Sequence, residues 1–233
     1  MNGELTITDT LITAPEEAPL TLDYVKQHVK ALGDYDDLLI QTFIEAATNY
    51  FEEQTGRQLI TATREAWIDA FPFCGQSGKL ARIELPKPPL ISVESVKYID
   101  GDGTLQTFTG GSPVADLFRI SAPAGPYARR GFVEPLSGGT WPTTRCETGA
   151  VRIRYTCGYG DTPDEIPALI RNALCCLVGT FDTYRSGSSE RTVSAVPFGV
   201  QMMLDGFKYS ALPSQVLRQY GSWVPQATAW WPR

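Results

Sequence analysis

The feature that most restricts the fold of this chain is a helix with almost no water-facing side, placed soon after a strand. In residues 151–157, VRIRYTC, apolar side chains alternate with Arg or Thr, which is the two-residue period of a half-buried strand. A glycine-flanked turn, GYG, follows at 158–160. The next predicted helix, from 168 to 181, has Arg171 and Asn172 as its only strongly polar residues. Such a helix must be covered by other parts of a protein on nearly all sides.

Two interpretations of this helix stay open. It is either the central core helix of one chain, which is the expectation for an isolated protein of this size, or a helix that packs partly against another subunit. Its start is predicted near Asp164, a candidate N-cap, with Pro167 in the first turn, where a missing N–H costs nothing.

The rest of the chain predicts an α+β protein with a helical core, made of two N-terminal helices and one long C-terminal helix, and an inserted antiparallel β domain. The predicted parts are an N-terminal arm without regular structure, a helical pair, the β insertion, the C-terminal helices and an extended aromatic tail. Their residues are 1–20, 21–57, 58–157, 164–208 and 209–233, respectively.

Local signals place the first two helices and the strands. Thr21 is expected to cap a short helix that ends at Gly33, and a second helix of about 20 residues is expected from Asp36 to Gly56. Its main apolar stripe is predicted to be Leu39, Phe43, Ala46, Ala47 and Tyr50, widened by Ile40, Ile44 and Phe51. Five segments have strand character, namely TREAWIDAF, RIEL, SVKYI, LQTF and VRIRY.

Composition excludes several classes of protein. The 26 Asp plus Glu against 20 Lys plus Arg give a net charge of −6, which argues against a surface that binds nucleic acid tightly. The five cysteines lack metal-ligand spacing, so neither a disulfide framework nor a zinc site is expected. The longest apolar run, at 173–178, is far short of the ~20 residues of a membrane span, and no signal peptide is visible. We therefore expect an unexported, soluble protein without a membrane partner.

Catalytic patterns are missing as well. The single histidine, His28, has charged neighbours, and no P-loop, dinucleotide fingerprint or zinc spacing is present. DGDG at 100–103 is interpreted as a hairpin turn rather than a calcium loop, because further acidic ligands are missing. We expect no enzyme activity, no catalytic or metal-binding residue and no cofactor.

The order of segments resembles a known family. The sequence contains, in order, APLTLDYVKQHVKAL, DDLLIQTFIEAATNYFEEQTGRQLITAT, IELPKPPLISVESVKYIDGDG, GTWPTT, AVRIRYTCGYG, IPALIRNALCCLVGTFDTYR and VPFGVQMML. Together these resemble the head-to-tail connector family (adaptor, or head-completion, proteins) of long-tailed bacteriophages and gene-transfer relatives. The likeness covers residues 15 to 208. Each segment alone is common, whereas seven in this order are specific.

The resemblance implies a structural protein of the virion neck, between capsid and tail, that is assembled in the bacterial cytoplasm. Family members form a ring of twelve copies under the portal protein, extend the DNA channel and dock the next neck protein, a stopper or head-closure protein. DNA would pass without tight binding, which an acidic lining favours. Candidate lining residues surround the second helix: Asp36, Asp37, Glu45, Glu52 and Glu53. A solvated outer face explains these acids equally well.

The last 25 residues lie beyond the resemblance. Trp223, Trp230 and Trp231 stand in a segment broken by three prolines, so it is expected to dock on the portal or on an adjacent subunit. Candidate interface residues are Trp223, Val224, Trp230, Trp231, Phe198, Met202 and Met203. Docking of this tail on its own β insertion is the alternative.

Two other functions stay possible from the sequence. The chain could be another neck or tail component, such as a stopper or a tail terminator. Less in keeping with the pattern is a carbohydrate- or receptor-binding module, for which the aromatic residues of the β insertion would serve as stacking platforms: Trp67, Trp141, Tyr98 and Tyr127.

Overall fold

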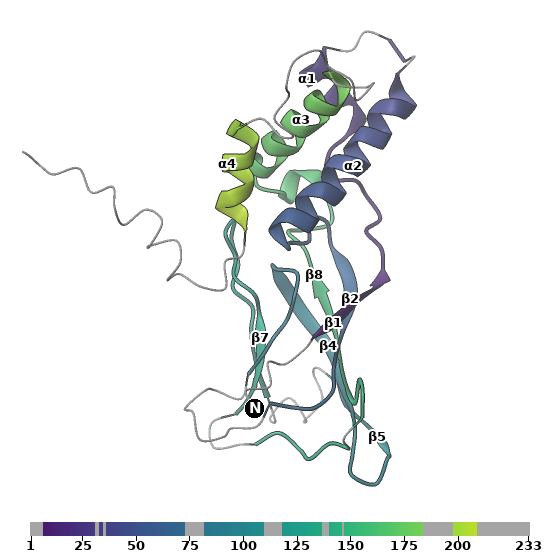
Figure 1. Ribbon diagram of the computed structural model, residues 1–233, viewed down its shortest axis with the longest axis vertical. Helices are drawn as coiled ribbons and strands as arrows, with labels where there is room; N and C mark the ends of the chain where they lie inside the picture. The colour runs from purple at the N-terminus through teal and green to yellow at the C-terminus, as the bar shows by residue number, and fades with distance from the viewer. Residues whose placement is uncertain are drawn as a thin grey trace, which may run out of the picture.

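The computed structural model describes most of the chain. The described residues are 7–30, 33–34, 36–72, 82–109, 118–136, 140–145, 147–183 and 198–208. They form an elongated molecule with the helices gathered at one end and the β-sheets at the other (Figure 1). The expected α+β class is confirmed.

The helical end contains four described α-helices. These are α1 (Leu22–Val29), α2 (Asp37–Thr55), α3 (Ala168–Thr183) and α4 (Phe198–Phe207). Thr21 caps α1 as expected, because its hydroxyl oxygen accepts a hydrogen bond from the backbone N–H of Tyr24 at 3.4 Å. The helix ends at Lys30, in the left-handed conformation, rather than at Gly33. The second helix has the predicted bounds and ends at Gly56, whose φ of +69° suits glycine.

The buried stripe of α2 differs from the prediction. The residues that face the core are Ile40, Ile44, Ala47, Phe51 and Thr55. Thus the residues expected only to widen the stripe form its centre, while Leu39, Phe43 and Tyr50 are half-buried and Ala46 is exposed. Both sets have helical spacing, so periodicity alone could not choose between them.

The nearly all-apolar helix is α3, and it is the centre of the helical core. It contacts α1, α2 and α4 (Figure 1), and Ala173, Leu174, Cys175, Leu177 and Val178 are buried within this one chain. The core-helix interpretation therefore accounts for the middle of α3. Leu169 in its first turn is 42% exposed, so the described part of the chain leaves this apolar side chain open.

The start of α3 is built differently from the expectation. A short 3-10 helix, Pro163–Glu165, precedes it, and Pro167 stands just before the first helical residue. Asp164 is not the cap, because its carboxylate pairs with Arg171 at 3.0 Å. The Glu165 carboxylate instead accepts hydrogen bonds from the backbone N–H groups of Asp161 (2.8 Å) and Thr162 (3.1 Å).

The β end contains two antiparallel sheets. The first has the order β1-β2-β8-β4-β5 and the second has the order β3-β7-β6. Their strands are β1 (Thr8–Thr13), β2 (Ala62–Ile68), β3 (Ile83–Glu84), β4 (Leu90–Ile99), β5 (Leu105–Thr109), β6 (Phe118–Ser121), β7 (Phe132–Pro135) and β8 (Val151–Cys157). Each of the five expected strand segments contains a strand, and β6 and β7 were not foreseen.

The first strand corrects the sequence interpretation. Residues 8–13 were expected to belong to an irregular arm, but they pair with β2 as an edge strand. The Asp9 carboxylate explains how this polar segment is held: it accepts a hydrogen bond from Arg64 Nε at 2.6 Å and one from the Tyr155 hydroxyl at 2.7 Å. Arg64 and Tyr155 lie 55 and 146 positions after Asp9 in the sequence, so a local sequence pattern could not predict this strand.

The alternation in β8 has the predicted effect. Val151, Ile153, Tyr155 and Cys157 are buried in the core between the sheets, while the intervening side chains are half-buried on the other face. The DGDG segment is the turn of the β4–β5 hairpin, as expected. The Asp100 carboxylate accepts backbone hydrogen bonds from Asp102 (3.1 Å) and Thr104 (2.8 Å), so it is occupied by the turn itself.

Among the described residues, no helix is both long and apolar enough to cross a membrane.

Candidate functional site at the joint of helices and sheets

A buried arginine joins the two ends of the molecule. Arg57, directly after the Gly56 that ends α2, is 3% exposed. Its guanidinium donates to the carbonyl oxygens of Phe207 (2.8 Å) and Ala128 (2.9 Å) and to the hydroxyl of Tyr159 (3.1 Å). Phe207 is the last residue of α4, where the helix dipole favours a positive charge. One side chain thereby ties together α2, α4, the loop before β7 and the turn after β8.

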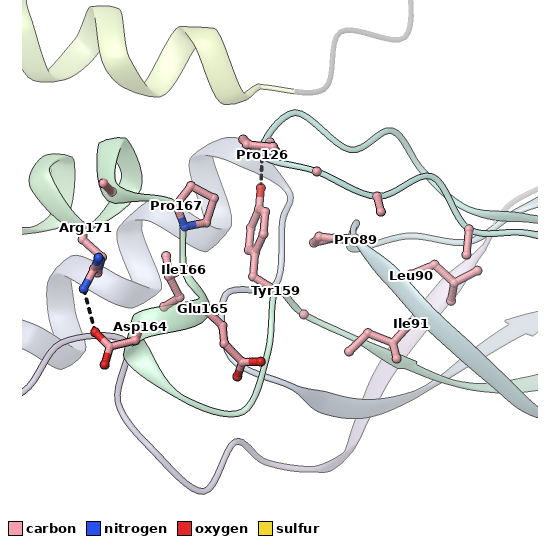
Figure 2. A pocket seen from close by; sticks show the side chains of 15 residues that line it. Pro89, Leu90, Ile91, Pro126, Tyr159, Asp164, Glu165, Ile166, Pro167 and Arg171 are labelled. Carbon is pink, nitrogen blue, oxygen red and sulfur yellow. Dashed lines mark hydrogen bonds and ion pairs between the residues drawn. The ribbon is translucent and has the colours of Figure 1, made fainter.

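Tyr159 extends this joint. Its hydroxyl donates a hydrogen bond to the carbonyl oxygen of Pro126 at 2.7 Å (Figure 2). Burial raises the pKa of Tyr159 above its ordinary value, against the opposing effect of the Arg57 charge, so the phenol keeps the proton that it donates. Beside it, the rings of Tyr127 and Phe207 stack at 5.0 Å between centroids. We call Arg57, Tyr127, Tyr159 and Phe207 the joint cluster.

A groove of about 690 Å³ lies next to the joint cluster. Figure 2 shows its labelled side chains, contributed by the start of β4, the loop before β7, the turn after β8 and the start of α3. Most of them are apolar or proline: Pro89, Leu90, Ile91, Pro126, Tyr159, Ile166, Pro167 and Ala168. A volume of this size accommodates several large side chains or a drug-sized ligand.

The polar groups of the groove are few and stand at one side. Asp164 and Arg171 form an ion pair there, and the Asp164 side chain is 94% exposed. Glu165 also lines the groove, but its carboxylate is occupied by the backbone hydrogen bonds at residues 161 and 162. Asp164 is therefore the groove carboxylate most open to a partner. Among the described lining residues, no nucleophile stands beside an activating base, and most of the lining is apolar.

The structure separates the five acids that the sequence offered as a channel lining. Asp37 accepts a hydrogen bond from Lys26 Nζ at 2.7 Å. Glu52 accepts two, from the backbone N–H of Leu59 and the side-chain amide of Gln58, both at 2.9 Å, and burial raises its pKa. These two carboxylates organise the chain itself, Asp36 is half-buried at the N-cap of α2, and Glu45 and Glu53 are exposed.

The candidate interface residues fall into two groups. Met202 on α4 is 66% exposed, Met203 is half-buried against the helical core, and Phe198 begins the same helix. Trp223, Val224, Trp230 and Trp231 lie outside the described residues. The structure therefore places only the α4 part of this set.

The four aromatic residues considered as sugar platforms each contact another side chain of the chain. Trp141 stacks on Phe71 at 4.6 Å, and Tyr98 meets Phe71 edge-on at 5.6 Å. Trp67 lies under the guanidinium of Arg152 at 4.3 Å, and Tyr127 stacks on Phe207. These contacts give each ring a structural role and weaken the case for a carbohydrate-binding module.

The sequence interpretation missed the joint cluster. Residues 158–160 were identified as a turn without a role for Tyr159, and Arg57 was given none. The available signal was weak: an arginine directly after a C-cap glycine, next to the apolar residues Leu59 and Ile60. In the described part of the chain, no group of three or more His, Cys, Asp or Glu side chains is arranged to hold a metal ion.

Comparisons with known proteins agree with this architecture at the level of the fold. No protein-family model matches the sequence. No curated protein matches it either. Solved structures that share the fold include a chain in the neck of an empty gene transfer agent particle, computed with C6 symmetry. It has a TM-score of 0.68 at 18% identity, over 88% of this chain and 97% of that chain.

Two further structures are similar. A chain of the virion of a native gene transfer agent particle has a TM-score of 0.67 at 18% identity, over 88% of this chain and 96% of that one. A chain in the neck of the native particle, computed with C12 symmetry, has a TM-score of 0.59 at 19% identity, over 88% and 97%. The fold is therefore one found in the neck of such particles, which confirms the resemblance expected from the sequence.

Proposed function

We propose that this chain is a structural adaptor of the neck of a phage-like particle, located between capsid and tail and assembled in the bacterial cytoplasm. The observation that carries the proposal is the shared fold, which spans 88% of this chain and nearly all of each neck or virion chain. Because the shared fold covers almost the whole of each similar chain, those chains have no further large domain that this chain lacks.

In this proposal twelve copies form a ring that binds the portal protein on one side and a stopper or other neck protein on the other. The C6 and C12 symmetries of the similar neck structures are compatible with such a ring. A ring contact is heterologous, so each copy needs two different complementary surfaces. The open groove on one side and the exposed apolar residues Leu38 and Met202 on the helices offer such unlike surfaces.

The DNA channel would pass through the ring. We propose that Glu45 and Glu53 of α2 contribute to its lining, since they are the candidate acids that remain exposed. A carboxylate-bearing wall repels phosphate groups, so DNA moves past it without being held. The chain needs no cofactor and no enzyme activity for this role.

The direct test is to locate the chain in particles. A short epitope inserted in the exposed β4–β5 turn, at residues 101–103, leaves both sheets paired. Cryo-electron microscopy with a bound antibody fragment should then show density around the neck, next to the portal, in twelve copies. Untagged particles serve as the control.

Other positions of the label discriminate between functions. Density one layer further from the capsid identifies a stopper or a terminator instead of an adaptor. Label on the capsid shell or at the tail tip, or no chain in purified particles, contradicts a neck function.

A further inference from the structure

The groove beside the joint cluster is an apolar recess for which the described chain provides no occupant. Ile91, at its edge, is 47% exposed, and Ala168 is exposed at the start of α3. Leu169, next in sequence, continues the exposed apolar surface. Apolar side chains gathered around a recess mark a binding surface more often than isolated ones do.

We propose that this groove receives the C-terminal segment, residues 209–233, of a second copy of the chain. The proposal rests on the proposed function, because it names the contact that would connect neighbouring copies of the ring. In this arrangement Trp230 and Trp231 bind a surface of the adjacent subunit and not one of the portal protein.

The chemistry of the segment matches that of the groove. Residues 209–233 contain three tryptophans, three prolines and two arginines, and no Asp or Glu, in a chain whose net charge is −6. The groove presents Pro89, Pro126, Pro167 and Tyr159, against which indole rings pack well, and the exposed carboxylate of Asp164. An arginine of the segment, Arg218 or Arg233, can pair with that carboxylate.

The position of α4 favours a second copy over the same copy. Figure 2 draws α4 on one side of the loop that carries Pro126 and the labelled groove residues on the other. Because Arg57 holds the last residue of α4 at this loop, a tail of the same copy would have to pass round the loop to enter the groove. A segment from a neighbouring copy does not have to pass round the loop.

The length of the segment allows the contact. Trp230 comes 22 residues after Lys208, and an extended chain of that length spans up to about 70 Å. A groove on one copy and a tail from the next also form a heterologous contact, which is the kind that a closed ring repeats.

Sedimentation velocity of the full-length chain tests the proposal through two variants that damage opposite halves of the contact. Ala168→Trp fills the groove, and the double substitution Trp230→Ala with Trp231→Ala removes the anchors. Each variant alone should self-associate at least tenfold more weakly than the unmodified chain. Ala168→Ser, which leaves the groove open, is the matched control and should associate normally.

An equal mixture of the two variants decides between the occupants. The groove variant still has an intact tail, and the tail variant still has an intact groove, so the mixture should regain pairs of unlike copies. If the tail occupies its own groove, mixing restores nothing, and the proposal is wrong. It is equally wrong if both variants associate like the unmodified chain, or if that chain stays monomeric at every concentration. If Ala168→Trp fails to fold, which circular dichroism shows, Ile91→Glu replaces it.

The result is separable from that of the proposed function. A labelled ring in the neck together with a failed mixing experiment leaves the neck function standing and removes only this contact. If mixing the variants restores pairing but no labelled chain is found at the neck, the contact stands and the neck function is removed.

Discussion

The Nε atom of Arg57 donates a hydrogen bond of 2.8 Å to the carbonyl oxygen of Phe207, so two residues 150 positions apart hold the ends of α2 and α4 together. The same guanidinium reaches Ala128 and Tyr159, and all of its acceptors are uncharged oxygens. One buried cation thus helps to fix the relative placement of helices and sheets.

Replacing Arg57 by Met should lower the free energy of unfolding by about 3 kcal/mol, because buried oxygen acceptors lose a charged donor that no water replaces. Urea denaturation measures the loss. Arg129→Met is the matched control, because Arg129 lies in the same loop, two residues after Tyr127, and its side chain is exposed. The free energy of unfolding of this variant should change by no more than about 0.5 kcal/mol. Equal losses in the two variants would show that the hydrogen bonds of Arg57 contribute nothing specific.

Asp9→Ala should release the edge strand β1. Removing this carboxylate leaves Arg64 and the Tyr155 hydroxyl without their shared acceptor, at a cost of about 2 kcal/mol. Hydrogen–deuterium exchange should accelerate in residues 8–13 more than in β8. Thr10→Ala, at an exposed position of the same strand, should leave exchange unchanged. Uniform acceleration across both sheets would mean that Asp9 supports the whole core rather than β1.

The thiols of Cys157 and Cys175 should react negligibly with a thiol reagent at pH 8 in the folded chain. Burial raises the pKa of Cys157 to about 12 and that of Cys175 to about 11, so almost no thiolate is present. Mass spectrometry of labelled peptides measures this, and denatured protein gives the fully labelled reference. Rapid labelling of either thiol below the unfolding transition would contradict the packing seen here.

The same shifts give a pH dependence. A thiol whose pKa is higher in the folded state contributes stability that is complete below the pKa of 9 of the unfolded chain. This contribution is lost as the pH rises from about 9 toward 11 and 12. Replacing Cys157 and Cys175 by Ala should flatten the fall in stability over that range, which urea unfolding at pH 8 and pH 10 detects.

Deleting residues 222–233 should leave the melting temperature nearly unchanged, because all the described residues of both hydrophobic cores precede residue 208. The truncated chain should nevertheless fail to attach stably to portal-bearing capsids, which electron microscopy of particles made with it would reveal as heads without tails. Replacing Trp230 and Trp231 by Phe keeps aromatic anchors and should retain part of the attachment. Early unfolding of the truncated chain, or normal particles, would count against a docking role for this segment.

The sequence by itself determined the features that depend on neighbours in the chain. The alternation of β8, the hairpin turn at 100–103 and the bounds of α2 between Asp36 and Gly56 follow from local periodicity and backbone preference. The order of segments carried the resemblance to neck proteins, which the shared fold confirms.

Only the tertiary structure decided which of two helical stripes is buried, that residues 8–13 become a strand, and that Arg57 and Tyr159 meet. Helical periodicity fits burial of Ile40 and of Leu39 equally well, and packing against the core around α3 buries Ile40. Asp9 gains its role from Tyr155, and Arg57 gains its role from Phe207. A buried charge or a polar edge strand is stable only where distant groups satisfy it, and no local pattern in the sequence records which distant groups will be there.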